Sequence, residues 1–265
     1  MKKVSMNFSL VKAVAIDLDG VVYFGNRVAP GAAAAIEGFR QAGIKVIFIT
    51  NNSGKNREEI ASKLNGLDIP CAIEEIYSSG YAAVLYIKSL KSEKLILVIG
   101  SDSLREEFVK AGLPMAKSVT CGFLVVGLDI SFTYDKIAAG MEALAHGAEF
   151  IACNIDANFP VEKGRLLPAC GAMVAAIERA SGKKVEVIVG KPNNYILQLV
   201  AREYNLKPQE LLVIGDSLDS DISMADKSGS PAILISSKTS PHVCTVKSLY
   251  QACRIITNQR LKERN

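Results

Sequence analysis

Strand-like and helical patterns alternate along almost the whole chain. Short apolar runs, typical of buried strands, occur at 11–18 (VKAVAIDL), 44–50 (IKVIFIT) and 211–215 (LLVIG). Helical spacing occurs between them, for example at 30–43 and 192–205. This alternation predicts right-handed crossovers and a parallel sheet, and therefore an α/β fold. The 265 residues, 49% of them hydrophobic, are enough for a core domain that carries a smaller one.

Polar residues follow several of these strands, at the sheet edge where ligands of parallel sheets bind. Asp17 and Asp19 end the first strand, and side chains at i and i+2 point to the same side. Two close carboxylates can both stay charged only beside a cation, and Mg²⁺ prefers such oxygen ligands. A strand-end turn, with Gly20 at positive φ, is the structural alternative.

Two further strand ends carry polar residues of another kind. The small polar cluster TNNS (50–53) precedes a helix, whose exposed N–H groups and dipole favour an anion. A simple helix N-cap is the alternative there. Lys191, followed by Pro192, comes after VEVIVG (185–190) and places a positive charge at the tip of a strand. Its alternative is an exposed surface lysine.

The last of these strand ends is acidic. The run GDSLDSD (215–221) contains Asp216, Asp219 and Asp221, which could complete the ligands of a cation. An acidic helix N-terminus is the alternative, and Asp219 is predicted to be only that. The similar turn LVIGSDSL (97–104) contains Asp102, for which we predict helix capping and no role in metal binding.

These motifs together resemble those of a known family. The order DLDGVVY (17–23), TNNS (50–53), GKP (190–192) and GDSLDSDI (215–222) resembles the haloacid dehalogenase-like (HAD) phosphohydrolases. The details are similar to class IIA, the NagD-like and 4-nitrophenylphosphatase-like branch. SGKNREE (53–59) and CNIDANFP (153–160), with Gly164, Pro168 and Gly171, add to this similarity, which covers nearly the whole chain.

The resemblance implies a Rossmann-like three-layer core with a parallel sheet and an inserted α/β cap domain. It assigns residues 1–78 and 184–265 to the core and 79–183 to the cap, with candidate hinges at 78–80 and 181–184. Ile155 and Ala169 depart from the cap pattern, where Pro and Gly are common. Because the cap selects the substrate in this family, these departures leave the substrate open.

The resemblance also implies a role for each motif residue. Asp17 would attack phosphorus and form an aspartyl-phosphate, while Asp19 would protonate the leaving oxygen and then activate water. The phosphate-binding residues would be Thr50, Asn51, Asn52 and Lys191, and Lys191 would also neutralise Asp17.

The metal and substrate residues are implied in the same way. Mg²⁺ would be bound by Asp17, Asp216 and the backbone carbonyl of Asp19, and Asp221 would act on the metal directly or through its waters. The cap residues Asn154, Asp156 and Arg165 would face the leaving group.

We therefore expect a Mg²⁺-dependent phosphatase that acts on small phosphorylated metabolites, such as nucleotide, sugar or glycerol phosphates, and on 4-nitrophenyl phosphate in vitro. A phosphomutase or phosphotransferase on the same core is one alternative, and a non-catalytic protein that binds phosphometabolites is another. A dehalogenase is disfavoured, because it would need neither Asp19 nor the acidic run 215–221.

Composition limits the partners and the compartment. The net charge of +4 is mild and no Lys/Arg block is present, so we do not expect binding to a nucleic acid lattice. No apolar run reaches the ~18 residues of a membrane span, and the MKK start lacks the pattern of a signal peptide. The six cysteines form no CxxC pair, so we expect buried, reduced thiols in a cytoplasmic protein. Similar proteins form dimers through the cap, which makes a homodimer one expected assembly.

Overall fold

The computed structural model describes residues 8–160 and 165–264, so Gly164 and the MKK start lie outside the described residues. Contacts divide the chain into two compact units. The core unit consists of Met1–Thr50, Ala61–Tyr77 and Lys191–Asn265, and the inserted unit of Asn51–Ile60 and Ser78–Gly190.

The core unit is built on a sheet with the strand order β14-β13-β12-β1-β4-β5. The bounds are β1 (Ala13–Asp17), β4 (Lys45–Thr50), β5 (Ile76–Ser78), β12 (Leu211–Gly215), β13 (Ala232–Ile235) and β14 (Cys244–Val246). The central strand β1 pairs in parallel with β4 on one side and β12 on the other. Every residue of β1 and β12 is buried, as expected for a parallel sheet covered on both faces.

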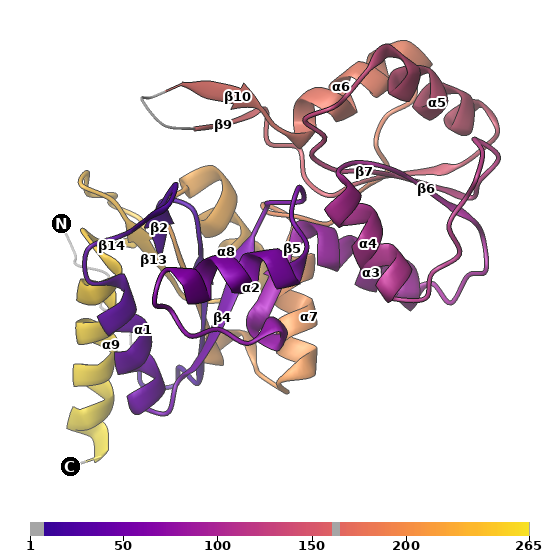
Figure 1. The fold of residues 1–265 in the computed structure, drawn as a ribbon. Coiled ribbons are helices and arrows are strands. Elements are labelled where there is room, and N and C mark those ends of the chain that lie inside the picture. Colours follow the sequence, from indigo (N-terminus) through magenta and orange to yellow (C-terminus); the bar gives the residue numbers. More distant parts are fainter. Residues whose placement is uncertain (1–7, 161–164, 265) are drawn as a thin grey trace. The chain divides into compact units, whose positions relative to one another are not determined.

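Helices of the core unit pack in pairs. The helix α1 (Ala32–Gln41) lies beside α9 (Leu249–Arg264), and α7 (Tyr195–Glu203) contacts α8 (Ser223–Ser228) (Figure 1). The helix α2 (Arg57–Gly66) begins in the inserted unit and ends in the core unit. A small hairpin, β2 (Tyr23–Phe24) and β3 (Arg27–Val28), follows the first aspartates. Short 3₁₀ turns occur at Ile73–Glu75 and Pro208–Glu210.

The inserted unit has its own parallel sheet, with the order β11-β8-β7-β6. These strands are β6 (Ile96–Ile99), β7 (Phe123–Val126), β8 (Glu149–Ala152) and β11 (Val187–Ile188). The helices are α3 (Ser79–Ser89), α4 (Asp102–Lys110), α5 (Tyr134–Ala145) and α6 (Cys170–Ser181). Helices α5 and α6 lie side by side, and the antiparallel hairpin β9 (Asn158–Pro160) and β10 (Leu166–Pro168) precedes α6 (Figure 1). The predicted α/β class with a Rossmann-like core is confirmed.

Three local expectations differ from the structure. The run 185–190 is not a strand of the core sheet, because β11 pairs with β8 in the inserted unit. The second border between the units therefore falls at 190/191 and not at 183/184, and residues 51–60 pack with the inserted unit. After β12 the acidic run forms a π-helix at Leu218–Ile222, which α8 follows. The assignment of the inserted unit as a substrate-selecting cap stays a prediction.

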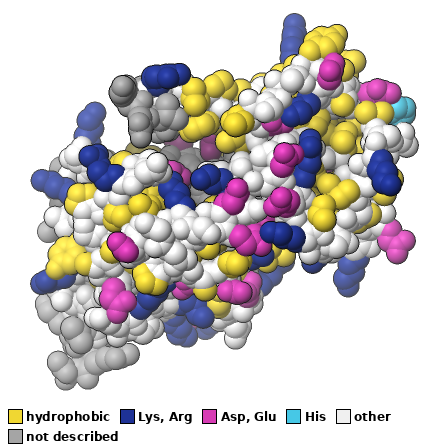
Figure 2. Space-filling view, in the orientation of Figure 1, with side chains coloured by type: hydrophobic (Ala, Val, Ile, Leu, Met, Phe, Trp, Pro, Cys, Tyr) yellow, Lys and Arg dark blue, Asp and Glu magenta, His cyan; other side chains and the backbone are white. Residues whose placement is uncertain are grey.

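All six cysteines lie in the described residues and are free thiols; Cys153, Cys170 and Cys253 are buried, while the other three are partly exposed. Within residues 8–160 and 165–264, helices long and apolar enough to cross a bilayer are lacking. On the face drawn in Figure 2, Lys and Arg side chains are interspersed with Asp and Glu side chains.

Substitution of Phe48 in β4 tests how much the buried side chains of the core sheet contribute to stability. Phe48 is fully buried, whereas Phe24 in β2 is 52% exposed. We expect Phe48→Ala to lower the free energy of unfolding by about 3–5 kcal/mol, since it leaves a cavity in a packed core. Phe24→Ala, the matched control, should cost less than about 1 kcal/mol. Urea unfolding followed by circular dichroism measures both, and equal losses would contradict this view of the core.

Candidate active site

The order of the core sheet brings three predicted site residues to one edge. The chain runs from β1 towards β4 and β5 on one side, and β12 to β14 lie on the other, so β1 and its neighbours flank a topological switch point. Ligands of α/β sheets bind outside the carboxyl ends of strands at such a point. Asp17 is the last residue of β1, Thr50 the last of β4, and Asp216 directly follows β12.

Lys191 connects two of the acids through buried ion pairs. Its Nζ donates to Asp17 Oδ1 at 2.5 Å and to Asp221 Oδ1 at 2.7 Å. All three residues are at most 6% exposed. The second oxygen of Asp221 accepts a hydrogen bond from the Ser217 backbone N–H at 3.2 Å. Lys191 is therefore not the exposed surface lysine of the alternative interpretation.

Asp17, Asp216 and Asp221 form an acidic cluster in which one carboxylate oxygen of each lies within 4.8 Å of the others. Burial raises the pKa of Asp17 well above its usual value; Lys191 opposes this effect, and Asp221 and Asp216 add to it. Burial and the charge of Asp221 also raise the pKa of Asp216. The Lys191 ammonium is paired with two of these three carboxylates, Asp17 and Asp221.

Burial disfavours the charge on Lys191, but Asp17 and Asp221 outweigh that effect and raise its pKa. Because its pKa lies above the usual lysine value, Lys191 is an ammonium ion at neutral pH.

Two glycines keep space for the acidic cluster. Gly20 has φ +89°, and a Cβ atom there would lie 2.1 Å from Asp216 Oδ2. A Cβ atom at Gly215 would lie 2.2 Å from Asp221 Cγ. Gly20 is therefore required both for its backbone conformation and for the close approach of Asp216.

Asp19 is not part of the acidic cluster of Asp17, Asp216 and Asp221. Its side chain is exposed, and its Oδ2 accepts a hydrogen bond from the Tyr23 hydroxyl at 3.4 Å. Burial and the nearby charges of Asp19 and Asp17 raise the pKa of Tyr23, so the phenol stays protonated as a donor. The Lys63 ammonium lies 3.5 Å from the centroid of the Tyr23 ring. Tyr23 and Lys63 were not predicted as site residues, although Tyr23 ends the motif 17–23.

The polar cluster after β4 makes contacts of several kinds. Thr50 is buried in the core unit. Asn51 contacts Asp156, Asn154 and Ser79 of the inserted unit. Asn52 accepts a hydrogen bond from the Gly54 N–H at 2.9 Å, in an Asx turn.

The remaining predicted residues lie apart from these contacts. Arg165 is exposed just before β10, and Asp219 is exposed on the π-helix. Asp102 is not the cap of α4: Ser101 is the N-cap and accepts from the Leu104 N–H, whereas Asp102 lies in the first turn, 3.4 Å from Arg105.

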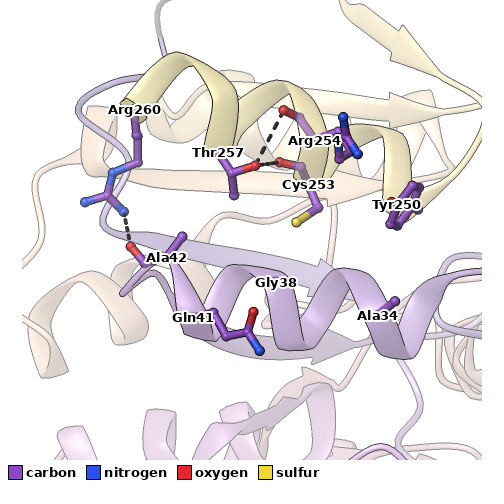
Figure 3. Close-up of a pocket in the computed structure, with 9 residues that line it drawn as sticks. All are labelled: Ala34, Gly38, Gln41, Ala42, Tyr250, Cys253, Arg254, Thr257 and Arg260. Atoms are coloured by element: carbon purple, nitrogen blue, oxygen red, sulfur yellow. Dashed lines mark hydrogen bonds between the residues drawn. The ribbon is translucent and has the colours of Figure 1, made fainter. Parts of the chain in front are cut away.

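A separate pocket of about 410 Å³ lies between α1 and α9 of the core unit (Figure 3). Small side chains of α1 form one wall, and Arg260 of α9 donates to the Ala42 carbonyl at 3.2 Å. The lining residues are Ala34, Gly38, Gln41, Ala42, Tyr250, Cys253, Arg254, Thr257 and Arg260. None of them is a predicted site residue, so the charged edge of the sheet remains the candidate active site.

Comparisons with known proteins show which family this chain resembles. Residues 14–114 match the family model described as haloacid dehalogenase-like hydrolase, and residues 188–248 match a HAD-hydrolase-like model. The 5'-nucleotidase YutF of Bacillus subtilis is 32% identical over 84% of this chain and 86% of its own length. The sugar-phosphatase AraL of the same organism is 33% identical over 84% and 82%. The 4-nitrophenylphosphatase of Thermotoga maritima has a similar fold, with a TM-score of 0.88, 23% identity and coverage of 95% and 99%.

Removal of the ammonium group tests the buried ion pairs. We expect Lys191→Met to lower the free energy of unfolding by about 3–5 kcal/mol, because Asp17 and Asp221 would stay buried without a partner. The double variant Lys191→Met/Asp221→Asn should recover part of this loss. Lys12→Met, at a lysine that is 62% exposed and paired with Glu210, is the control and should change stability little. Urea unfolding in the presence of a chelator measures all three, and equal stability of the two single variants would contradict the assignment.

Proposed function

The chain belongs to the haloacid dehalogenase-like hydrolases, in their class IIA branch of phosphatases, and on that basis we propose that it hydrolyses phosphate monoesters through an aspartyl-phosphate on Asp17. The observation that carries this proposal is the buried contact between Lys191 and Asp17, beside two further carboxylates at the switch point of the sheet. A carboxylate nucleophile divides a difficult hydrolysis into two easier steps.

The substrates that we propose are small phosphorylated metabolites. The relatives that support this are a 5'-nucleotidase and a sugar phosphatase, each more than 30% identical over more than four fifths of this chain. Nucleoside monophosphates and sugar phosphates are thus the first classes to assay, with 4-nitrophenyl phosphate as a chromogenic substrate.

The first step forms a bond between a carboxylate oxygen of Asp17 and phosphorus, and the ester P–O bond breaks. Asp19 donates a proton to the leaving oxygen, and its exposed side chain with the Tyr23 contact suits a group that must meet the substrate. In the second step Asp19 takes a proton from water, the water oxygen attacks phosphorus, and phosphate leaves while Asp17 is regenerated.

The transferred group carries charge on three oxygens, so positively charged groups and N–H donors stabilise its transition state. We assign the binding of these oxygens to Lys191, Thr50, Asn51 and Asn52. Lys191 is suited to this role because it is buried, charged and already fixed by two carboxylates.

The acidic cluster fits a hard divalent cation. Its three carboxylates lie within 4.8 Å of one another with one ammonium among them, and Mg²⁺ prefers oxygen ligands of this kind. We propose that Asp17, Asp216, Asp221 and the backbone carbonyl of Asp19 hold Mg²⁺. The cation, when bound, supplies positive charge that stabilises the phosphoryl oxygens.

Substitution of the nucleophile tests the mechanism. Asp17→Asn should lower kcat for 4-nitrophenyl phosphate by about 10³-fold or more, because an amide oxygen cannot form the aspartyl-phosphate. Asp102→Asn is the matched control, since Asp102 lies in a turn of similar sequence but is exposed on α4. If Asp17→Asn retains full turnover, the proposed mechanism is wrong.

Removal of metal tests the cofactor. EDTA should abolish hydrolysis and added Mg²⁺ should restore it, while Asp216→Asn should raise the Mg²⁺ concentration for half-maximal activity by about tenfold or more. Asp219→Asn removes an exposed acid from the same run and should leave this concentration unchanged. A rate that is insensitive to EDTA would contradict the metal assignment.

A further inference from the structure

Three side chains of the inserted unit hold Asn51, the residue that directly follows β4. The Asn51 carbonyl accepts hydrogen bonds from Ser79 Oγ at 2.7 Å and from Asn154 Nδ2 at 2.6 Å. The Asn51 side chain donates through Nδ2 to Asp156 Oδ2 at 2.9 Å. Asn154 and Ser79 are buried, and their side chains lie 3.4 Å apart. Both the backbone and the side chain of Asn51 are therefore fixed.

The two bonds to the Asn51 carbonyl also orient the next amide. The carbonyl of Asn51 and the N–H of Asn52 belong to one planar trans peptide and point in opposite directions. A carbonyl with two donors has both lone pairs occupied, so the plane of this peptide is set. Ser79 and Asn154 thus determine the direction in which the Asn52 N–H points.

The Asn51 side chain is also enclosed on a second side. A Cβ atom at Gly190 would lie 2.6 Å from Asn51 Oδ1, and the Gly190 N–H donates to the Cys153 carbonyl at 2.8 Å. Gly190 directly precedes Lys191 in the chain. Asp156 and Gly190 therefore hold the Asn51 amide between them.

The turn that carries Asn154 and Asp156 is itself rigidly supported. Asn154 Oδ1 accepts from the Asp156 N–H at 3.1 Å, and the Gly171 N–H at the start of α6 donates to the Asp156 carbonyl at 2.9 Å. A Cβ atom at Gly171 would lie 2.3 Å from the Ile155 carbonyl oxygen, so this turn packs directly on α6.

The loop that begins at Asn51 is bound to α4 at its other end, near Arg57. The Arg57 N–H donates to Oε1 of the buried Glu107 at 2.6 Å, and Asn56 donates to Glu106 at 3.1 Å. The loop from Asn51 to Arg57 is therefore fixed by the inserted unit at both ends.

We propose that Ser79, Asn154 and Asp156 are positioning residues, which hold the phosphate-binding loop at Asn51 and do not select the part of the substrate beyond the phosphate. The proposal rests on the proposed phosphatase function and assigns these residues a different role from the one expected of cap residues. It requires that their loss weakens binding of the phosphoryl group itself, and hence affects every substrate by the same factor.

The test compares Asp156→Ala, Asp156→Asn and the control Asp135→Ala, which removes an exposed acid in the first turn of α5. The readouts are kcat/KM for 4-nitrophenyl phosphate, a nucleoside monophosphate and a sugar phosphate, and the inhibition constant of orthophosphate. Asp156→Ala should lower kcat/KM by about tenfold to a hundredfold, equally for all three esters, and should weaken orthophosphate inhibition. Asp156→Asn keeps an acceptor oxygen for Asn51, so it should lose several-fold less than Asp156→Ala.

Two further variants test the same role without a substitution at Asp156, in case the Asp156 variants do not fold. Ser79→Ala removes one donor to the Asn51 carbonyl, and Asn154→Asp removes the other while it keeps the acceptor for the Asp156 N–H. Both should weaken orthophosphate inhibition in protein that unfolds cooperatively in a thermal scan.

Any one of three results would overturn the positioning role: unequal losses among the three esters, equal losses for Asp156→Asn and Asp156→Ala, or unchanged orthophosphate inhibition in all variants. A wild-type protein that hydrolyses none of the esters would instead overturn the proposed function. Orthophosphate affinities from calorimetry would then decide the positioning role by the same comparison of variants.

Discussion

The structure depends most on the buried ammonium of Lys191 and its two carboxylate partners. Removal of three charges from water costs several kcal/mol per ion, and only close pairing and additional hydrogen bonds offset that cost. The three residues come from the end of β1, the border between the units and the π-helix after β12. The strand order brings these charged residues to one edge of the sheet, and Gly20 and Gly215 leave space for the acidic side chains there.

The sequence was sufficient to predict Asp17, Thr50 and Asp216 at one edge because a parallel sheet collects the carboxyl ends of its strands regardless of side-chain detail. The motif GKP (190–192) was sufficient to predict Lys191 as a site residue. The sheet that the preceding strand joins could not be predicted. The run 185–190 is equally apolar whether it joins the core sheet or the other one, and only the pairing with β8 decides. Hydrophobic periodicity carries information about burial, and none about the partner of a strand.

The hydrogen bonds around Asn51 show a second limit of the sequence. Asn154 and Asp156 were recognised as residues of interest, but their partner lies 103 and 105 positions away. Ser79 was missed because a serine at the start of a helix has the same pattern as an N-cap, and the neighbouring Ser78 is indeed the cap of α3. Contacts between short polar side chains of distant segments leave no periodic signal, so only the folded structure shows them.

The loop after β4 is held in place by contacts of both kinds, and this matters for the proposed catalysis. Donors that bind a phosphoryl group are effective only when they are fixed before the substrate arrives, because reorientation during the reaction costs free energy. Thr50 is fixed by the core sheet, and Asn51, one peptide bond later, is fixed by Ser79, Asn154 and Asp156. If the proposed positioning role holds, the inserted unit would contribute to binding of the phosphoryl group of any substrate, since its side chains hold the residue that follows Thr50.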